Sequence, residues 1–370
     1  MAVTRRTQSP QVLLCGYYGE HNLGDDALLA VLLDQIPSPW MSRVTAHDSE
    51  AVQGLHQGYG VRAVQRRSLK ATAQALIHSD ALVLGGGSLL QDSTSFKSLI
   101  YYICLLALAR LRSIPVILWG QGLGPLNRWT SRLLVRLILP GVRAIGWRDP
   151  ASKRLADQWH VSVPTLVAAD PVWSFPGLVW DGQHCADAER SGIVLCWRPT
   201  RQLNLHEWAR LIEVVNQLAE DQSLPVTWLA FHKHQDHPLP GWLETHGLMP
   251  ETLARRSRFQ LAESLDQVLT LFSRSQLVLP MRLHALILSQ LAGAPCAALS
   301  YDPKVAEAAA MAKLDCVDLD HLPSFDDLMR RWTDQLMHPV DAHTIDCIKE
   351  DAGRHGAMLH RELSRIMSSH

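Results

Sequence analysis

Residues 276–300 read QLVLPMRLHALILSQLAGAPCAALS, and this stretch decides the fold class. The apolar runs at 276–279 and 295–300 predict two short buried strands, and the longer segment at 283–291 predicts a helix between them. A strand, a helix and a second strand in this order are typical of a parallel α/β fold. Because functional loops follow the carboxyl ends of such strands, we expect chemistry around residues 280–284.

The same alternation extends over most of the 370 residues, a length that predicts two or three domains at about 150 residues each. Residues 175–191 lose the periodicity and gain turn residues, which indicates a linker. We therefore expect an α/β fold with two Rossmann-like domains facing across a cleft, at 1–178 and 192–340, followed by a C-terminal helix at 341–370. Further strands are predicted at 12–15, 81–84, 115–119, 144–146, 165–168, 193–197 and 226–231, and further helices at 205–221 and 265–273.

Charge and composition exclude several classes of protein. Lys and Arg number 35 against 36 Asp and Glu, so the chain lacks the broad basic field of a general nucleic-acid binder. The seven cysteines are scattered without a C-x-x-C pair, so neither a disulfide framework nor a zinc site is indicated.

The most apolar stretch, 98–120, is interrupted by Arg110 and Arg112 and is too short to span a bilayer. With no signal-peptide pattern at the N-terminus, we expect a cytoplasmic protein and leave peripheral membrane contact open.

Three glycine-rich segments follow predicted strands in the first half: GYYGEHNLGDDALL from Gly16, GGGSLLQD at 85–92, and GQGLGP at 120–125. Glycines let a backbone approach a ligand closely, and the N–H groups at a helix start attract anions. None matches a phosphate-binding Walker A loop or the dinucleotide fingerprint. The alternative for the first segment is a turn with a helix cap supplied by Asp25 or Asp26. The candidate ligand contacts are Gly16, Gly86, Gly87, Ser88 and Gln121.

Three charged residues follow strands of the first half. Asp92 could accept a proton or bind a sugar hydroxyl, although a solvated helix-face carboxylate is the more common role. Arg148 ends a strand, and it either binds ligand or pairs with a neighbouring carboxylate. Asp170 precedes a proline, which favours a turn.

In the second half, Arg198 and His232 each follow a predicted strand. The segment FHKHQDH around His232 raises the question of a metal site, but its spacing matches no common zinc pattern. We expect a polar loop with one functional histidine, and metal binding is the lesser alternative. Arg282, Leu283 and His284 lie at a helix start, where the amides and the dipole favour an anion. Arginine adds a fork of donors for phosphate or carboxylate, and histidine can transfer a proton near neutral pH.

Together these segments resemble the polysaccharide pyruvyl transferase family, in particular its CsaB-like branch. The resemblance rests on GYYGEHNLGDDALL, LVLGGGSLLQD, WGQGLGP, RDPASKRL, ADPVW, CWRP, FHKHQD, MRLHALILSQLAGAP and SYDPK, which run in order from residue 11 to about 305. It implies a glycosyltransferase-B-like fold and transfer of enolpyruvate from phosphoenolpyruvate to a sugar of a cell-wall or surface polysaccharide, on a lipid-linked precursor, with closure of a cyclic pyruvate ketal. It places Arg198, Arg282 and His284 at the donor and Asp92 on the acceptor side.

From this resemblance we predict that Arg198, Arg282 and the amides at Leu283 bind the donor, that His284 is the general acid, and that Asp92 orients or deprotonates an acceptor hydroxyl. Lys304, in the SYDPK segment, is expected beside the donor site. The chemistry needs no redox cofactor and no obligatory metal. The alternatives are a nucleotide-sugar glycosyltransferase or epimerase of the same fold, and a non-catalytic glycan-binding or anion-binding relative.

Overall fold

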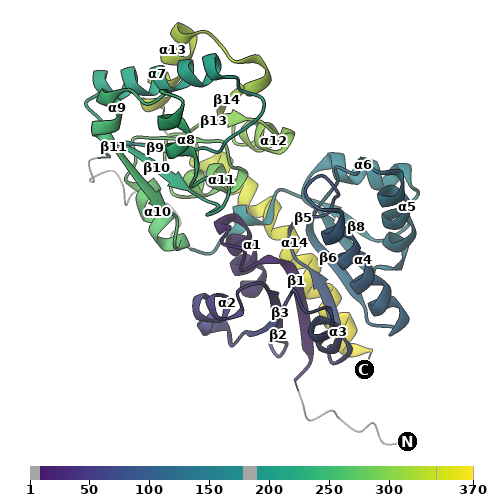
Figure 1. The fold of residues 1–370 in the computed structure, drawn as a ribbon. Coiled ribbons are helices and arrows are strands. Elements are labelled where there is room, and N and C mark those ends of the chain that lie inside the picture. The colour runs from purple at the N-terminus through teal and green to yellow at the C-terminus, as the bar shows by residue number, and fades with distance from the viewer. Residues whose placement is uncertain (1–8, 178–189, 339, 370) are drawn as a thin grey trace, which may run out of the picture. The chain divides into compact units, whose positions relative to one another are not determined.

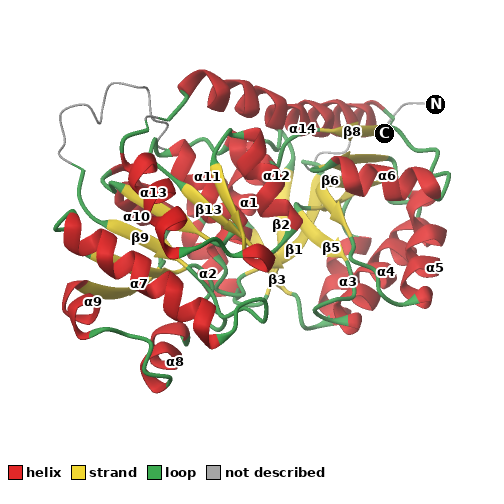
Figure 2. Ribbon diagram, turned by 90° about the horizontal axis from the view of Figure 1, so that it is seen from above, coloured by secondary structure: helices red, strands yellow, loops and turns green. Residues whose placement is uncertain are grey.

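The computed structural model describes residues 9–177, 190–338 and 340–369. Most of the linker predicted at 175–191 therefore lies outside the described residues. Contacts divide the chain into two compact units. The first comprises residues 1–20, 25–175 and 349–370, and the second comprises residues 21–24 and 176–348. Each unit contains parallel strands flanked by helices (Figures 1 and 2).

The first unit is built on an eight-stranded sheet with the order β3-β2-β1-β4-β6-β7-β8, and β5 pairs with β6. All of these pairs are parallel. Its strands are β1 (Gln11–Tyr18), β2 (Met41–Ala46), β3 (Arg62–Gln65), β4 (Ala81–Leu84), β5 (Gly87–Leu90), β6 (Val116–Leu123), β7 (Ala144–Trp147) and β8 (Thr165–Val167). The connecting helices are α1 (Leu23–Asp34), α2 (Ser49–Leu55), α3 (Leu69–Ile77), α4 (Phe96–Leu111), α5 (Trp129–Ile138) and α6 (Pro150–Gln158).

The second unit contains a four-stranded parallel sheet with the order β11-β10-β9-β12, and a parallel pair β13-β14. A bridge between Val278 and Cys296 links β12 to the segment before β13. The strands are β9 (Ile193–Cys196), β10 (Val226–Ala230), β11 (Ser257–Leu261), β12 (Leu277–Pro280), β13 (Ala297–Ser300) and β14 (Asp315–Asp318). The helices are α7 (Leu205–Asp221), α8 (Leu239–Thr245), α9 (Glu251–Arg256), α10 (Leu265–Ser273), α11 (Leu283–Leu291), α12 (Pro303–Met311) and α13 (Phe325–Leu336). The last helix, α14 (Ala342–Ser368), begins in the second unit and belongs to the first unit from Lys349 onward.

The cores explain why short apolar runs form these strands. Every residue of β4, β9, β12 and β13 is buried, as expected for parallel strands covered on both faces. Tryptophans fill much of the space between sheet and helices, with Trp119 and Trp147 in the first unit and Trp208 and Trp332 in the second all fully buried. Burial of each such ring contributes a large hydrophobic stabilisation.

Strand β6 is longer than the sequence predicts. We expected a strand at 115–119 and a glycine-rich loop at 120–125, but β6 continues to Leu123, so the loop prediction was wrong for residues 120–123. Gly120 has a positive φ of 59°, and the pairing of β6 with β7 becomes irregular between Leu118 and Gln121. Glycine tolerates this local bulge, which lets the strand continue beyond it.

Candidate functional site

In the second unit, polar residues collect where the strands end. Arg198 follows β9, His232 follows β10, Arg282 is the N-cap of α11 directly after β12, and Tyr301 follows β13. Because these strands are parallel, their carboxyl ends lie at one edge. The structure thus places the predicted residues Arg198, His232, Arg282, Leu283, His284 and Lys304 at the same edge of one unit.

Asp236 holds two of these loops together. Its buried carboxylate accepts hydrogen bonds from the backbone N–H groups of Phe231 (3.1 Å) and His232 (2.8 Å). It also forms an ion pair with Arg282, whose Nε donates over 3.2 Å and whose terminal nitrogen contacts the other carboxylate oxygen. The same arginine donates to Gln235 at 3.1 Å. Sequence reasoning missed Asp236 as a site residue, and the available signal was a carboxylate four residues after His232.

His232 is buried and uncharged. Its Nδ1 accepts the backbone N–H of His234 at 3.2 Å, so the neutral ring carries its proton on Nε2 and can donate from there. Burial lowers the pKa of His232 below 6.5, the charge of Arg282 lowers it further, the carboxylate of Asp236 opposes the shift, and the charge of Arg198 adds to the lowering. Both guanidinium groups therefore act electrostatically on this ring, and Asp236 offsets part of their charge.

Residues 21–24 position His284, the second residue of α11. The backbone N–H of Leu23 donates to Phe231, and that of Lys233 donates to His21. Gly24 lies directly against the His284 ring, and a Cβ at this position would overlap it. The first glycine-rich segment thus contributes to the second unit through Gly24, a residue that sequence reasoning did not single out.

Arg198 is oriented by an aromatic ring. Its guanidinium lies 5.1 Å from the centre of the Tyr301 ring, and one terminal nitrogen donates to the Tyr301 hydroxyl at 3.3 Å. Gln202 donates to the backbone carbonyl of Tyr301 at 2.9 Å and fixes that turn. Lys304 follows in the first turn of α12, with its side chain half-buried. Sequence reasoning quoted the segment SYDPK but missed the role of Tyr301.

The first unit brings together Ser88, Gln121 and Arg148, which we predict as ligand contacts, and their polar groups bind protein atoms. Arg148 forms a buried ion pair with Asp170 at 2.8 Å and donates to Ser88 at 3.1 Å. Gln121 donates to the backbone carbonyl of Leu84 at 3.3 Å. Of the two interpretations of Arg148, the structure shows the ion pair. Asp170 also accepts the N–H of a residue two positions on, so the predicted turn is present as well.

The glycines predicted to approach a ligand differ in their surroundings. The Tyr18 ring fills the space beside Gly16, and the Leu28 side chain fills the space beside Gly86, so protein packing accounts for both. Gly87 has a φ of 97°, and a Cβ there would lie 3.8 Å from Asp25. Among the three, Gly87 is the position where backbone geometry itself requires glycine.

Asp92 is buried rather than solvated on a helix face. It accepts hydrogen bonds from the backbone N–H groups of Asn127 (2.7 Å) and Arg128 (2.9 Å), just before α5. Burial alone would raise the pKa of Asp92, but the two backbone hydrogen bonds and the positive charge of Arg128 oppose it, and the pKa is lowered. A carboxylate held in this way stabilises the start of α5 and is a weak base.

The pKa of Asp26 shifts in the opposite direction to that of Asp92, and sequence reasoning missed this residue as a site candidate. Burial raises the pKa of Asp26 to about 7, the charge of Asp25 adds to the rise, and a backbone hydrogen bond from Gly19 opposes it. A carboxyl group that titrates near neutral pH suits proton transfer. The signal was the paired carboxylates of the GDD sequence, which we considered only as helix caps.

Within residues 9–177, 190–338 and 340–369, no three His, Cys, Asp or Glu side chains are grouped as metal ligands. Among the same residues, no helix combines the length and the apolar character needed to cross a bilayer.

Known structures share this fold. The UDP-GlcNAc 2-epimerase of Neisseria meningitidis bound to UDP-GlcNAc has 15% identity and a TM-score of 0.58, with 96% of this chain and 100% of that chain covered. A putative UDP-N-acetylglucosamine 2-epimerase of Listeria monocytogenes has 11% identity and a TM-score of 0.61, with 97% of each chain covered. The Anabaena protein HepE in complex with UDP has 12% identity and a TM-score of 0.59, with 97% and 100% covered. These likenesses confirm a mixed α/β fold with parallel sheets, similar to glycosyltransferase-B proteins.

A search of curated proteins finds no match to the sequence. The family model described as polysaccharide pyruvyl transferase matches residues 22–303, which is more than half of the chain. The matched range begins in the segment that contacts His284 and includes Arg198, His232 and Arg282. The resemblance inferred from the motifs is confirmed, and the chain belongs to the polysaccharide pyruvyl transferase family.

Proposed function

We propose that this chain transfers enolpyruvate from phosphoenolpyruvate to a sugar of a cell-wall or surface polysaccharide precursor, which is lipid-linked, and closes a cyclic ketal with release of phosphate. The observation that carries the proposal is the cationic edge of the second unit. There Arg198 and Arg282 both act on the buried, neutral His232, beside the N-terminus of α11. Membership of the family supports a sugar or polysaccharide as the acceptor.

The donor fits the charge of this edge. Phosphoenolpyruvate carries a phosphate and a carboxylate close together, so its site needs several cationic or N–H donors. Arg198 and Arg282 supply guanidinium groups, and the first amides of α11, including that of Leu283, supply N–H groups and the positive end of a helix dipole. Neutral His232 can add one donor through Nε2 without adding charge. Lys304 would add a further ammonium group.

The chemistry needs one acid at the vinyl carbon. His284, as imidazolium, would give its proton to the methylene carbon of the donor, which leaves positive character at C2. A sugar hydroxyl oxygen would attack C2 and lose its proton. The bond from C2 to the phosphate oxygen would then break with its electron pair leaving on phosphate, and a second hydroxyl of the same sugar would attack C2 and lose its proton to close the ketal. The sequence is redox-neutral and calls for acid and base groups, so we propose that no cofactor takes part.

Asp26 is the carboxyl group of the first unit best suited to act as the base. Its pKa of about 7 lets it take a proton from a hydroxyl at neutral pH, whereas hydrogen bonds lower the pKa of Asp92. We keep Asp92 as a residue that could orient the acceptor, since its carboxylate lies at the start of α5.

The direct test is phosphate release from phosphoenolpyruvate with a pyrophosphoryl-linked aminosugar acceptor. His284→Ala should lose turnover by at least about a hundredfold, as expected when a general acid is removed. His206→Ala, which alters an exposed histidine in the first turn of α7, is the control. Undiminished turnover of His284→Ala would contradict its assignment.

A second measurement tests the donor itself. Thermal-shift assays with phosphoenolpyruvate, UDP-sugars and CMP-sugars should show protection by phosphoenolpyruvate. Protection by a nucleotide sugar alone would instead favour a glycosyltransferase or epimerase of the same fold. Binding of phosphoenolpyruvate without any product, across a panel of sugar acceptors, would favour a non-catalytic relative.

A further inference from the structure

Helix α5 exposes an apolar stripe on the first unit. Trp129, Leu133 and Leu137 are 73%, 45% and 62% exposed. Their spacing of four residues places them along one side of the helix. The opposite side is buried through Ser131 and Val135, so α5 packs on the unit by one face and presents a second apolar face outward. Large apolar side chains aligned in this way mark an interaction surface.

Arginines border this stripe. Arg128, Arg132 and Arg136 are all exposed and repeat with the same spacing of four residues. The backbone carbonyl of Leu126 accepts a hydrogen bond from Arg132 at 2.8 Å, and the guanidinium of Arg128 lies 4.7 Å from the centre of the Phe96 ring. From residue 93 to residue 148 the chain contains one lysine and seven arginines but no aspartate or glutamate. This strongly basic segment occurs in a protein whose formal net charge is only -1.

The end of α4 extends the same surface. Leu111 is 81% exposed and lies between the exposed Arg110 and Arg112. Helices α4 and α5 pack alongside one another (Figures 1 and 2). Phe96 at the start of α4 contacts Arg128, and Arg110 lies against Gly141 just after α5.

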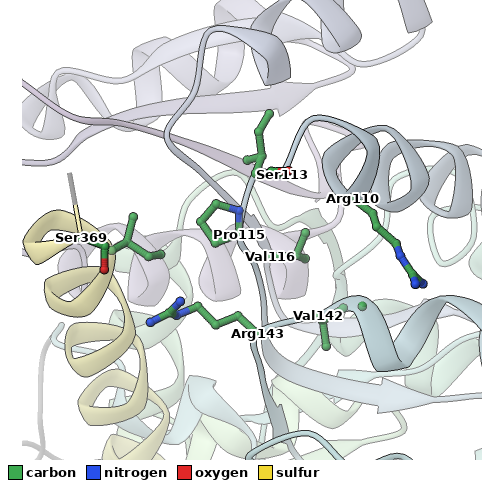
Figure 3. A pocket seen from close by; sticks show the side chains of 10 residues that line it. Arg110, Ser113, Pro115, Val116, Val142, Arg143 and Ser369 are labelled. Carbon is green, nitrogen blue, oxygen red and sulfur yellow. The ribbon is translucent and has the colours of Figure 1, made fainter.

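A hollow of about 450 Å³ opens beside this point, and Arg110 and Arg143 line it (Figure 3). Arg143 is engaged by Glu362 of α14 at 2.9 Å, whereas Arg110 is exposed. The basic groups therefore continue from α5 to the end of α4.

We propose that this α5 surface, defined as Trp129, Leu133 and Leu137 with Arg128, Arg132 and Arg136, docks the protein in the plane of a bilayer that contains anionic phospholipids. An apolar helix face with a tryptophan enters the boundary between headgroups and acyl chains, and flanking arginines pair with lipid phosphates. A polyanion such as RNA would use the arginines but not the exposed leucines. The proposal is independent of the reaction and of its donor.

Vesicle flotation with the full chain tests the proposal, without phosphoenolpyruvate or acceptor. We expect binding to vesicles of phosphatidylglycerol and phosphatidylcholine, and weak binding to phosphatidylcholine alone. Leu133→Ser/Leu137→Ser should abolish flotation, whereas Leu55→Ser/Leu205→Ser, which alters two leucines of similar exposure on other helices, should leave it unchanged.

Arg132→Gln/Arg136→Gln should weaken partitioning by about 25-fold, since each basic residue near an anionic surface contributes about five-fold. The altered side chains are exposed, so melting temperatures should stay close to that of the parent protein. No binding to anionic vesicles, or flotation that persists in the leucine variant, would overturn the proposal. Binding to an RNA homopolymer with no vesicle binding would assign the arginines to a polyanion instead.

Discussion

Replacement of Asp236 is the sharpest test of how the donor edge is built. Asp236→Ala removes the acceptor of two backbone N–H groups and the partner of Arg282, whose side chain is only 15% exposed. Loss of one partner from a buried ion pair costs about 3–5 kcal/mol. We expect the free energy of unfolding of the second unit to fall by that amount.

Asp236→Asn separates the two contributions. One oxygen of Asp236 accepts both backbone N–H groups, and the amide oxygen of asparagine can take its place. The amide NH2 then replaces the other oxygen and faces the Arg282 donor. We expect a smaller loss of stability than for the alanine variant, because both variants lose the charge that pairs with Arg282 but asparagine keeps the acceptor of the two backbone N–H groups. Phosphoenolpyruvate affinity should fall by about tenfold, equivalent to about 1.4 kcal/mol, because Arg282 is no longer held in place.

The assay pairs urea denaturation with calorimetric titration of the donor. Tryptophan fluorescence follows unfolding of both units, because buried tryptophans lie in each core, among them Trp208 in the second and Trp119 in the first. Asp315→Asn is the matched control, because Asp315 pairs with Arg331 away from the donor edge and both side chains are more exposed, at 28% and 22%. The control should cost no more than about 1 kcal/mol and leave donor affinity unchanged. Equal losses of stability for the asparagine and alanine variants of Asp236, or unchanged donor affinity, would refute this account.

Three further predictions concern single positions. The pKa of Asp26 is raised to about 7, so the folded protein keeps a proton that the unfolded chain releases above pH 4. The free energy of unfolding therefore contains a contribution from protonated Asp26 that is fully present below pH 4 and is lost as the pH rises to 7. In urea titrations between pH 4 and 8, Asp26→Asn should reduce the fall in the free energy of unfolding by up to about 4 kcal/mol. If the slope of unfolding free energy against pH is unchanged in the variant, the raised pKa is contradicted. Gly24→Ala should lower turnover by at least about tenfold without unfolding the protein, since the new methyl displaces the ring of His284, the proposed general acid. Gly54→Ala, where a Cβ meets open space, should leave turnover in the same assay unchanged. Arg148→Ala should cost about 3–5 kcal/mol in thermal and urea unfolding, since it removes one charge of a buried ion pair. A cost below about 1 kcal/mol would show that the pair is dispensable.

The sequence predicts which loops share one edge of the sheet, because topology follows from periodicity. Alternating apolar runs and helices require parallel strands, and residues after parallel strands must share an edge. Arg198, His232 and Arg282 could therefore be grouped before any distance was known. Strand β5 and the extension of β6 were not predicted, because a glycine-rich segment reads as a loop unless its pairing partner is known.

Partnerships between side chains could not be predicted in the same way. Asp236 meets Arg282 across 46 positions of sequence, and Asp170 meets Arg148 across 22. Such pairs depend on which rotamers and loop conformations the packed core allows, and the spacing of residues along the sequence does not predict them. The raised pKa of Asp26 likewise comes from burial, which depends on the neighbours that cover the residue. Periodicity thus located the candidate site, and packing decided what each polar group does there.

Helix α14 imposes an order on biosynthesis. From Lys349 onward it belongs to the first unit, where Asp351 accepts the backbone N–H of Ala169 at 2.7 Å and Glu362 pairs with Arg143 at 2.9 Å. The ribosome makes all of residues 176–348 before it makes these contacts possible. The first sheet therefore lacks the C-terminal part of α14 while the whole second unit emerges from the exit tunnel. A nascent chain that stalls within the second unit presents an unfinished first unit to chaperones and proteases.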